Sequence, residues 1–229
     1  MLRWRSFGLA NLSAPGTIHE WLLLSSGFSC VLLATRMLVT GTIEYIFLPW
    51  NLFLAFVPYW ITWRMTRDIS ILEHKVKLLT TLIAWLLFFP NSFYIITDLF
   101  HFARIRSAPK WFDLLLIFSF AWNGIIGGIL SLRRIEIIAG LLGKKKFSLV
   151  LVFAVMWLSA FGIYIGRFLR FNSWDVITDP FSLAGEIIGM VIHPFDNSYA
   201  WGMTLCYSVF MTFLYFTVKK LGESFTALK

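Results

Sequence analysis

Residues 147–167, FSLVLVFAVMWLSAFGIYIGR, decide the fold class of this chain. No charged residue occurs in this stretch before Arg167. A run of about 20 apolar residues is long enough to cross the hydrocarbon core of a membrane as an α-helix. Similar runs recur along the chain, and they predict six membrane spans near residues 21–39, 45–63, 78–97, 112–132, 147–167 and 199–218.

The composition favours a single membrane domain. Of the 229 residues, 59% are hydrophobic and 14% are charged, whereas about a quarter of the residues in a soluble domain are charged. No polar tract of domain size interrupts the apolar runs. We therefore expect an all-α fold, a polytopic transmembrane helical bundle over residues 21–220, with a cytoplasmic N-terminal segment (1–20) and a cytoplasmic tail (221–229).

One further apolar stretch, residues 181–192, is too short to cross a membrane. Asp179 is of a residue type that caps helix N-termini, and Pro180 suits the first helical position. The length and composition predict a short interfacial or re-entrant helix. An ordinary amphipathic surface helix is the alternative that the sequence leaves open.

The distribution of Lys and Arg predicts the orientation. Most of these residues lie in the two terminal segments and in the second and fourth loops, which share one side of a six-span bundle. Positively charged loops stay in the cytoplasm, so both termini are predicted to be cytoplasmic. The net charge of +8 is then mainly an orientation signal. Because no basic face is visible, no nucleic-acid partner is expected.

Small and amide residues within the spans predict helix packing. Asn123 lies near the middle of the fourth span, where an interhelical hydrogen bond is the expected role. Gly124 and Gly128 have the spacing at which small residues allow two helices to approach closely. We expect packing within the bundle from this pair rather than dimerisation.

A first polar motif, PNSFYIITDLFH at residues 90–101, lies at the outer end of the third span. In a continuous α-helix, Asn91, Tyr94, Asp98 and His101 would share an arc of roughly 80°. Pro90 is expected to bend the helix beside them because proline removes a backbone hydrogen bond. Since lipid offers polar atoms no partner, this stripe must face protein, water or a ligand.

A second polar motif, RFLRFNSWD at residues 167–175, ends the fifth span on the same side. Arg167 and Arg170 would lie one helical turn apart on one face of a helix. Together the two motifs predict a polar pocket at the outer surface. The residues expected to line it are Asn91, Tyr94, Asp98, His101, Arg167, Arg170, Asn172 and Asp175.

Three kinds of chemistry are compatible with this pocket. The two Arg side chains could bind a phosphate or a carboxylate. Asp98 or His101 could act as a general base, and these two are the candidate catalytic residues. The candidate ligands for a divalent metal are Asp98, His101, Asp113 and Asp175. No spacing is diagnostic, so catalysis and any cofactor stay undetermined, and a purely structural pairing of Arg with Asp stays open.

We therefore expect a protein that binds an anionic lipid headgroup or a small anion at its outer face. One alternative is a scaffold or accessory subunit of a membrane assembly. Another is a membrane-embedded hydrolase or transferase, metal-assisted or acid–base, that acts on a lipid-linked substrate. Membrane lipids are the expected partners, joined under the scaffold alternative by a membrane protein.

Both motifs resemble the signatures of domain-of-unknown-function family 1361, which comprises small multipass bacterial membrane proteins. The similar stretches are FPNSFYIITDL (89–99), GRFLRFNSWDV (166–176) and NLFLA (51–55) with Pro58. Phe93 stands where the family often has a second Pro, and Phe171 where it often has Trp. The resemblance covers about residues 45–218 and implies a bacterial cytoplasmic (inner) membrane protein. It implies no activity, because the family has none established.

Overall fold

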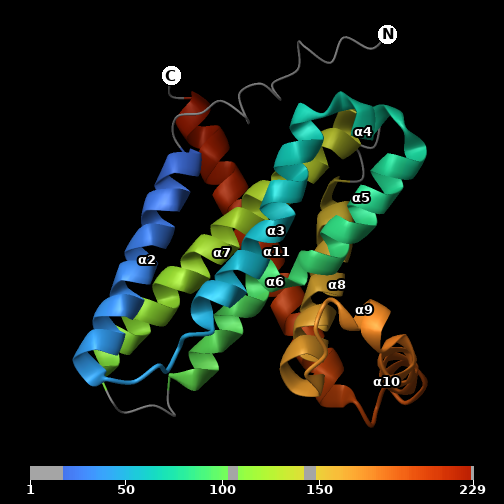
Figure 1. Ribbon diagram of the computed structural model, residues 1–229. Coiled ribbons are helices and arrows are strands. Elements are labelled where there is room, and N and C mark those ends of the chain that lie inside the picture. The colour runs from blue at the N-terminus through green and yellow to red at the C-terminus, as the bar shows by residue number, and fades with distance from the viewer. Residues whose placement is uncertain (1–17, 103–107, 142–147, 228–229) are drawn as a thin grey trace. The chain divides into compact units, whose positions relative to one another are not determined.

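The computed structural model describes residues 18–102, 108–141 and 148–227 (Figure 1). Within these residues the secondary structure is helical, without strands. The chain divides into two compact units, residues 1–135 and 136–229, which are described separately below. Nearly all of the predicted N-terminal segment, residues 1–20, lies outside the described part of the chain.

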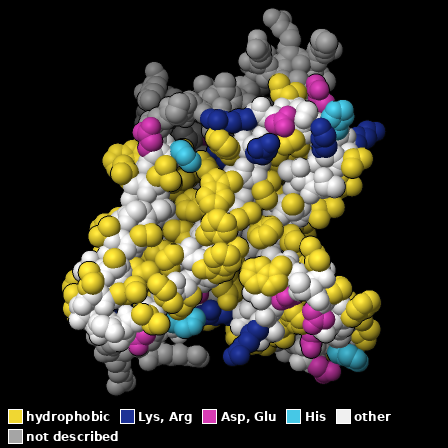
Figure 2. Space-filling model, viewed as in Figure 1, with side chains coloured by type: hydrophobic (Ala, Val, Ile, Leu, Met, Phe, Trp, Pro, Cys, Tyr) yellow, Lys and Arg dark blue, Asp and Glu magenta, His cyan; other side chains and the backbone are white. Residues whose placement is uncertain are grey.

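The first unit contains a core between apolar helices. Its elements are α2 (Ile18–Thr40), α3 (Leu48–Arg67), α4 (Ile69–Glu73), α5 (Lys75–Phe88), α6 (Pro90–Tyr94), the 3₁₀-helix η2 (Ile95–His101) and most of α7 (Lys110–Ala139). Figure 2 shows hydrophobic side chains along the middle of these helices and charged side chains toward their ends. The buried centre is apolar, with Leu48, Leu116 and Phe120 fully enclosed.

The second unit is built on two helices that pack along each other, α8 (Ser148–Tyr164) and α11 (Ser198–Ala227). Trp157 and Phe161 of α8 stack on Trp201 of α11, with ring centroids 6.4 and 5.3 Å away. The π-helix η5 (Ile165–Leu169), the short α9 (Asp175–Thr178) and α10 (Pro180–Ile192) connect the two. Asp179 caps α10 by accepting from the Ser182 N–H, and Pro180 begins the helix, as predicted.

Within the described residues, five helices are long and apolar enough to cross a membrane. They are Ile18–Thr40, Lys75–His101, Lys110–Ala139, Ser148–Leu169 and Ser198–Phe225, and α10 is a shorter apolar helix. They confirm the predicted all-helical class and match five of the six predicted spans.

The second predicted span, near residues 45–63, is the exception. It forms α3, which has 20 residues but is not among the five apolar helices. Trp, Tyr, Pro and Asn side chains lower its mean hydropathy, although its length equals that of a membrane span. One side of α3 is buried in the core, and Trp50, Phe53 and Trp60 are exposed on the other. The expectation of six apolar spans is therefore corrected to five apolar helices and one aromatic-rich helix.

The third predicted span is broken at Pro90 rather than continuous. α5 ends at Phe88, α6 begins at Pro90, and η2 follows from Ile95. The break lies where the missing N–H of Pro90 was expected to bend the helix. In a 3₁₀-helix residues three apart are eclipsed, so Asp98 and His101 share a face of η2. The four residues of the predicted polar stripe therefore do not lie on one continuous α-helix. Asn91 and Tyr94 belong to α6, and Asp98 and His101 belong to η2.

Close packing of α6 against α7 depends on two glycines. A Cβ at Gly128 would lie 2.7 Å from Cβ of Ser92, and one at Gly124 would lie 3.1 Å from the Ser92 carbonyl oxygen. The first distance cannot form without displacing Ser92, and the second is tighter than most contacts of a Cβ atom, so its neighbour would also have to move slightly. The Ser92 hydroxyl donates to the Ala55 carbonyl of α3 at 2.8 Å. The expectation that this glycine pair serves packing within the bundle is confirmed.

The predicted hydrogen bond of Asn123 is also present. Its Nδ2 lies 3.2 Å from Oγ of Ser29, which joins α7 to α2, and 2.8 Å from the Ser119 carbonyl oxygen. Both side chains are fully buried. The amide thus links two apolar helices by one of the few polar contacts available to them.

Candidate functional site

Asp98 lies in the interior of the first unit. Its side chain is 1% exposed, and Asn51 Nδ2 donates to its Oδ2 at 2.8 Å. Asn51 belongs to the first turn of α3, so this bond joins α3 to η2. A buried carboxylate is costly without such donors. The bond therefore both satisfies Asp98 and positions it.

His101 follows Asp98 by one turn of η2. Its Nδ1 lies 3.3 Å from the Asp98 carbonyl oxygen, and its ring centroid lies 5.0 Å from that of Phe47. A carbonyl oxygen can only accept, so Nδ1 carries the hydrogen in this bond. In the neutral ring the hydrogen is then on Nδ1 and not on Nε2.

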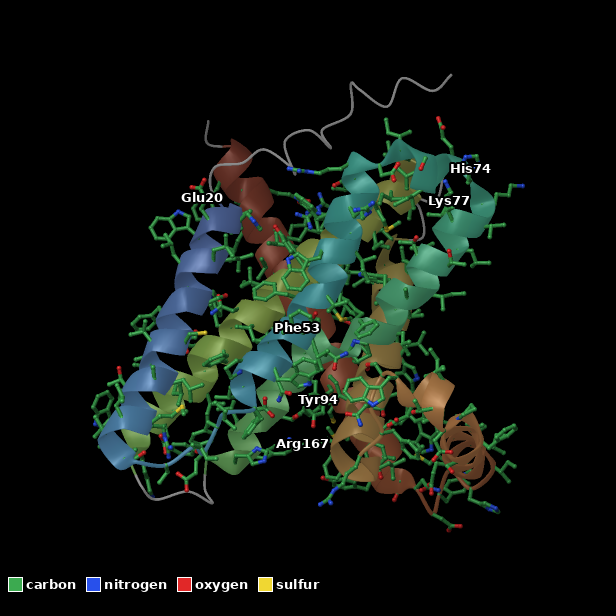
Figure 3. The ribbon with its side chains drawn as sticks, viewed as in Figure 1. Glu20, Phe53, His74, Lys77, Tyr94 and Arg167 are labelled. Carbon is green, nitrogen blue, oxygen red and sulfur yellow. The ribbon has the colours of Figure 1, made fainter. Side chains whose placement is uncertain are left out.

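Asn91 has a structural contact at the break before Pro90. The Ser92 N–H bonds to the Phe89 carbonyl rather than to that of Phe88, and Asn91 Nδ2 donates to the Phe88 carbonyl oxygen at 3.0 Å. The amide therefore satisfies a carbonyl that the irregular backbone leaves available, as is required within a membrane. Tyr94 is half-buried in the next turn, toward the end of the unit away from His74 and Lys77 (Figure 3).

The second motif leaves the helix sooner than the sequence predicted. α8 passes into the π-helix η5, which contains the half-buried Arg167 (Figure 3). Arg170 is the C-cap and has a left-handed backbone with φ of +64°. Its side chain is exposed. The expectation that Arg167 and Arg170 share one α-helical face is therefore wrong, because the π-turn and the left-handed residue change the backbone direction.

Asn172 and Asp175 form a local turn that follows Arg170 in the chain. Asp175 Oδ2 accepts from the Asn172 N–H at 2.6 Å, and its Oδ1 accepts from the Thr178 hydroxyl at 2.9 Å. The Asn172 backbone bond, followed by the Thr178 bond, lowers the pKa of the Asp175 carboxyl. Asp175 therefore stays ionised and is committed to the start of α9.

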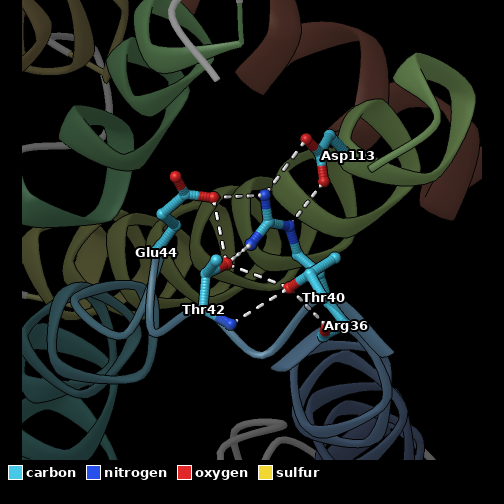
Figure 4. Close-up of polar contacts among 5 residues, drawn as sticks. All are labelled: Arg36, Thr40, Thr42, Glu44 and Asp113. Atoms are coloured by element: carbon cyan, nitrogen blue, oxygen red, sulfur yellow. Dashed lines mark hydrogen bonds and ion pairs between the residues drawn. The ribbon is translucent and has the colours of Figure 1, made fainter. Parts of the chain in front are cut away.

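A buried ionic cluster that sequence reasoning missed is centred on Arg36 (Figure 4). Arg36, 1% exposed, donates through Nε to Asp113 Oδ1 at 2.7 Å and through Nη2 to Glu44 Oε2 at 2.8 Å. Thr42 joins the network at 3.2 Å from Nη1. The cluster ties the connection between α2 and α3 to the start of α7. The sequence feature that could have indicated this cluster is Arg36 itself, because a single Arg inside an apolar span requires a polar partner.

Tyr45 lies beside this cluster in a strained conformation. Its φ is +65°, which is rare for an aromatic residue, and the Arg36 guanidinium lies 4.6 Å from its ring centroid. Its hydroxyl is buried without a hydrogen-bond partner among the described residues. Burial raises the pKa of the Tyr45 hydroxyl to about 12, so the hydroxyl remains neutral.

A second cluster that the sequence did not reveal lies in the second unit. Glu136, 8% exposed, accepts from the Tyr215 hydroxyl and the Lys219 ammonium group, each at 2.5 Å, and from the Ser148 hydroxyl. These contacts join the end of α7 to α8 and α11. Oppositely charged residues near the ends of two apolar segments were the available signal, but their spacing does not identify the pairing.

The candidate metal ligands do not form a metal site among the described residues. No three His, Cys, Asp or Glu side chains in that part of the chain lie close enough together to hold an ion. Asp113 is instead paired with Arg36, and Asp175 is bonded within its own turn. The geometry therefore favours hydrogen bonding and ion pairing over metal coordination at these two positions.

The apolar helices, with polar groups at their ends, are those of a multipass helical membrane protein. The chain belongs to the family described as protein of unknown function DUF1361, whose model matches residues 50–216. The match includes both polar motifs and most of α3. No curated protein and no solved structure matches the chain.

Proposed function

We propose that this protein is a multipass protein of the bacterial cytoplasmic membrane that binds an anionic group at its extracytoplasmic end. The ligand would be a lipid headgroup or a small anion with phosphate or carboxylate oxygens. Arg170 would be the principal contact, with Arg167 beside it in the second motif. Asn91, Tyr94, Asp98 and His101 of the first motif would form a separate polar site within the first unit.

The observation that carries this proposal is the environment of Arg170. Its guanidinium is exposed and has no hydrogen-bond or ion-pair partner within the described part of the chain. The residue also holds a left-handed conformation, which costs about 1–2 kcal/mol for a residue with a Cβ and is usually taken by glycine at a helix end. A strained, unpaired Arg is the arrangement expected of a binding residue.

The contacts of three acidic residues weaken the alternative that Arg170 pairs with a carboxylate to hold helix ends together. Asp113 is paired with Arg36, whereas Asp175 accepts from Asn172 and Thr178. Asp98 accepts from Asn51. Asp98, Asp113 and Asp175, the carboxylates with which Arg170 could have paired, therefore each accept from another donor.

Native mass spectrometry of the gently extracted protein tests the proposal. We expect the wild-type protein to retain an anionic adduct that Arg170→Ala loses. The planar guanidinium is the group that would donate hydrogen bonds to the oxygen atoms of the anion. Lys110→Ala is the matched control, since it removes an exposed cation from the same predicted side and should keep the adduct. The adduct mass distinguishes a phospholipid from a free anion.

Two results would contradict the proposal. One is a wild-type protein that carries no adduct under conditions that preserve its fold. The other is an Arg170→Ala protein that retains the adduct in full. A loss of folded protein in Arg170→Ala is addressed with Arg170→Gly, which relieves the left-handed strain and should lose the adduct while remaining folded.

The proposed orientation has α3 crossing the membrane as the sixth span. In the first unit, Arg64, Arg67, Lys75 and Lys77 lie at one end of α3 and Arg36 at the other, which supports a cytoplasmic end at Arg67. With six crossings both termini would be cytoplasmic.

Cysteine accessibility on either side of α3 tests this topology. Ile43→Cys, before α3, should react with an impermeant thiol reagent added to the periplasm, whereas His74→Cys, after α3, should not. Both native residues are exposed. The background carries Cys30→Ser and Cys206→Ser, because the native thiols are free and exposed. Labelling of both positions from the same side would contradict a spanning α3.

A further inference from the structure

The helix α10 has three distinct faces. At about 100° per residue, Leu183, Ile187 and Met190 form one face. Of these, Met190 is only 3% exposed, and the Trp201 indole of α11 donates to its carbonyl oxygen at 3.2 Å. This face therefore packs on the second unit and fixes the position of the helix.

A second face of α10 is apolar but uncovered. Phe181, Ile188, Val191 and Ile192 are 89, 55, 59 and 63% exposed, and they fall within an arc of roughly 100° next to the packed face. The third face carries the exposed Ser182 and Glu186. A surface helix in water needs only one apolar face. Two apolar faces and one polar face indicate three different surroundings: protein, hydrocarbon and water.

The position of α10 in the chain places it at a membrane boundary. It lies in the connection between α8 and α11, which pack along each other and are both long and apolar enough to span (Figure 1). A connection between two such neighbouring spans begins and ends at the same surface of the bilayer. The uncovered face of α10 is therefore held within reach of the lipid boundary.

The charges of the connection indicate how it would bind lipid. Residues 171–197 contain Asp175, Asp179, Glu186 and Asp196 and neither Lys nor Arg. Interfacial helices that depend on anionic lipid carry basic residues on their polar face. Attraction here would come from apolar area alone, and it would not require anionic headgroups.

We infer that α10 is an interfacial helix whose face of Phe181, Ile188, Val191 and Ile192 is embedded in the boundary between the headgroups and acyl chains of the bilayer. The Trp201 contact holds the neighbouring packed face of the helix to the protein, while Glu186 faces water. The binding partner is the phospholipid leaflet itself. This inference goes beyond the proposed anion site and does not depend on it.

Spin labels at single cysteines test the inference. In the Cys30→Ser/Cys206→Ser background, labels are placed at Ile188→Cys and Val191→Cys for the apolar face and at Ser182→Cys and Glu186→Cys for the polar face. The full-length protein is reconstituted in phosphatidylcholine vesicles. Val31→Cys, on the exposed apolar side of α2, and His74→Cys provide the lipid and water references.

We expect positions 188 and 191 to collide several-fold more with oxygen, which concentrates in lipid, than with a water-soluble nickel complex. Positions 182 and 186 should show the reverse ratio. Adding phosphatidylglycerol should leave both patterns unchanged. The inference is overturned if 188 and 191 behave as the water reference, or if they are shielded from both reagents as in a protein interface. A pattern that appears only with phosphatidylglycerol also overturns it.

Discussion

Replacing Arg36 with methionine should lower the free energy of unfolding by about 3–5 kcal/mol, the usual cost of removing one partner from a buried ion pair. Arg36 is 1% exposed, and the variant would leave Asp113, 2% exposed, without its guanidinium donor. It would also remove the donor to Glu44. Unfolding in mixed micelles, followed by far-UV circular dichroism, measures the change.

The double variant Arg36→Met/Asp113→Leu is the informative control. Replacing both members of a buried pair with apolar residues is often neutral, so much of the lost stability should return. Arg36→Lys should fall between wild type and Arg36→Met, because lysine keeps the charge but not the fork of donors. A single variant as stable as wild type would show that the cluster in Figure 4 does not hold the α2–α3 connection to α7.

Replacing Glu136 with glutamine should have the second large effect, also about 3–5 kcal/mol. Glutamine has nearly the same size as glutamate. Its amide group, however, has only one oxygen that accepts hydrogen bonds, whereas the carboxylate has two. The Lys219 ammonium group, whose side chain is 14% exposed, would lose its counter-charge. Because glutamine keeps one acceptor oxygen, either the Tyr215 hydroxyl or the Lys219 and Ser148 donors would lose their acceptor. The same unfolding measurement applies.

Glu223→Gln on α11, the helix that carries Tyr215 and Lys219, provides the matched control. Glu223 pairs with Lys220 at 2.9 Å, but both side chains are largely exposed, and exposed ion pairs contribute little to stability. This variant should unfold almost as the wild type does. Equal losses in the two variants would show that burial does not decide the contribution of Glu136, and would contradict its assignment as a tie between α7, α8 and α11.

The fold class could be predicted because it depends on properties that add up along the chain. Apolar length determines whether a helix can span, and the missing N–H of Pro90 interrupts a helix wherever the residue occurs. The cap at Asp179 is equally local. α3 was overestimated as an apolar span because its Trp and Tyr residues count as hydrophobic but contribute little hydropathy.

The polar contacts were predicted less completely than the helices. Asn123 was expected to bond across helices, and it does, but Ser29 could not be identified as its partner. The ion-pair partner of Asp113 could not be identified either, because nothing in the sequence distinguishes Arg36 from Arg170 as that partner. The π-helical turn before Arg170 could not be predicted from the spacing of the apolar residues. One extra residue in a helical turn does not interrupt an apolar run.

By itself, therefore, the sequence determined that the chain is helical, which segments are apolar, where Pro90 interrupts a helix and which polar residues gather near helix ends. Only the tertiary structure decided that Arg36 joins Asp113 and Glu44, that Glu136 joins Tyr215 and Lys219, and that Arg170 is exposed on a left-handed backbone. Hydropathy and helix breaking are sums over neighbouring residues. The partner of a buried charge depends instead on which helix faces meet, and that is set by packing across residues distant in the chain.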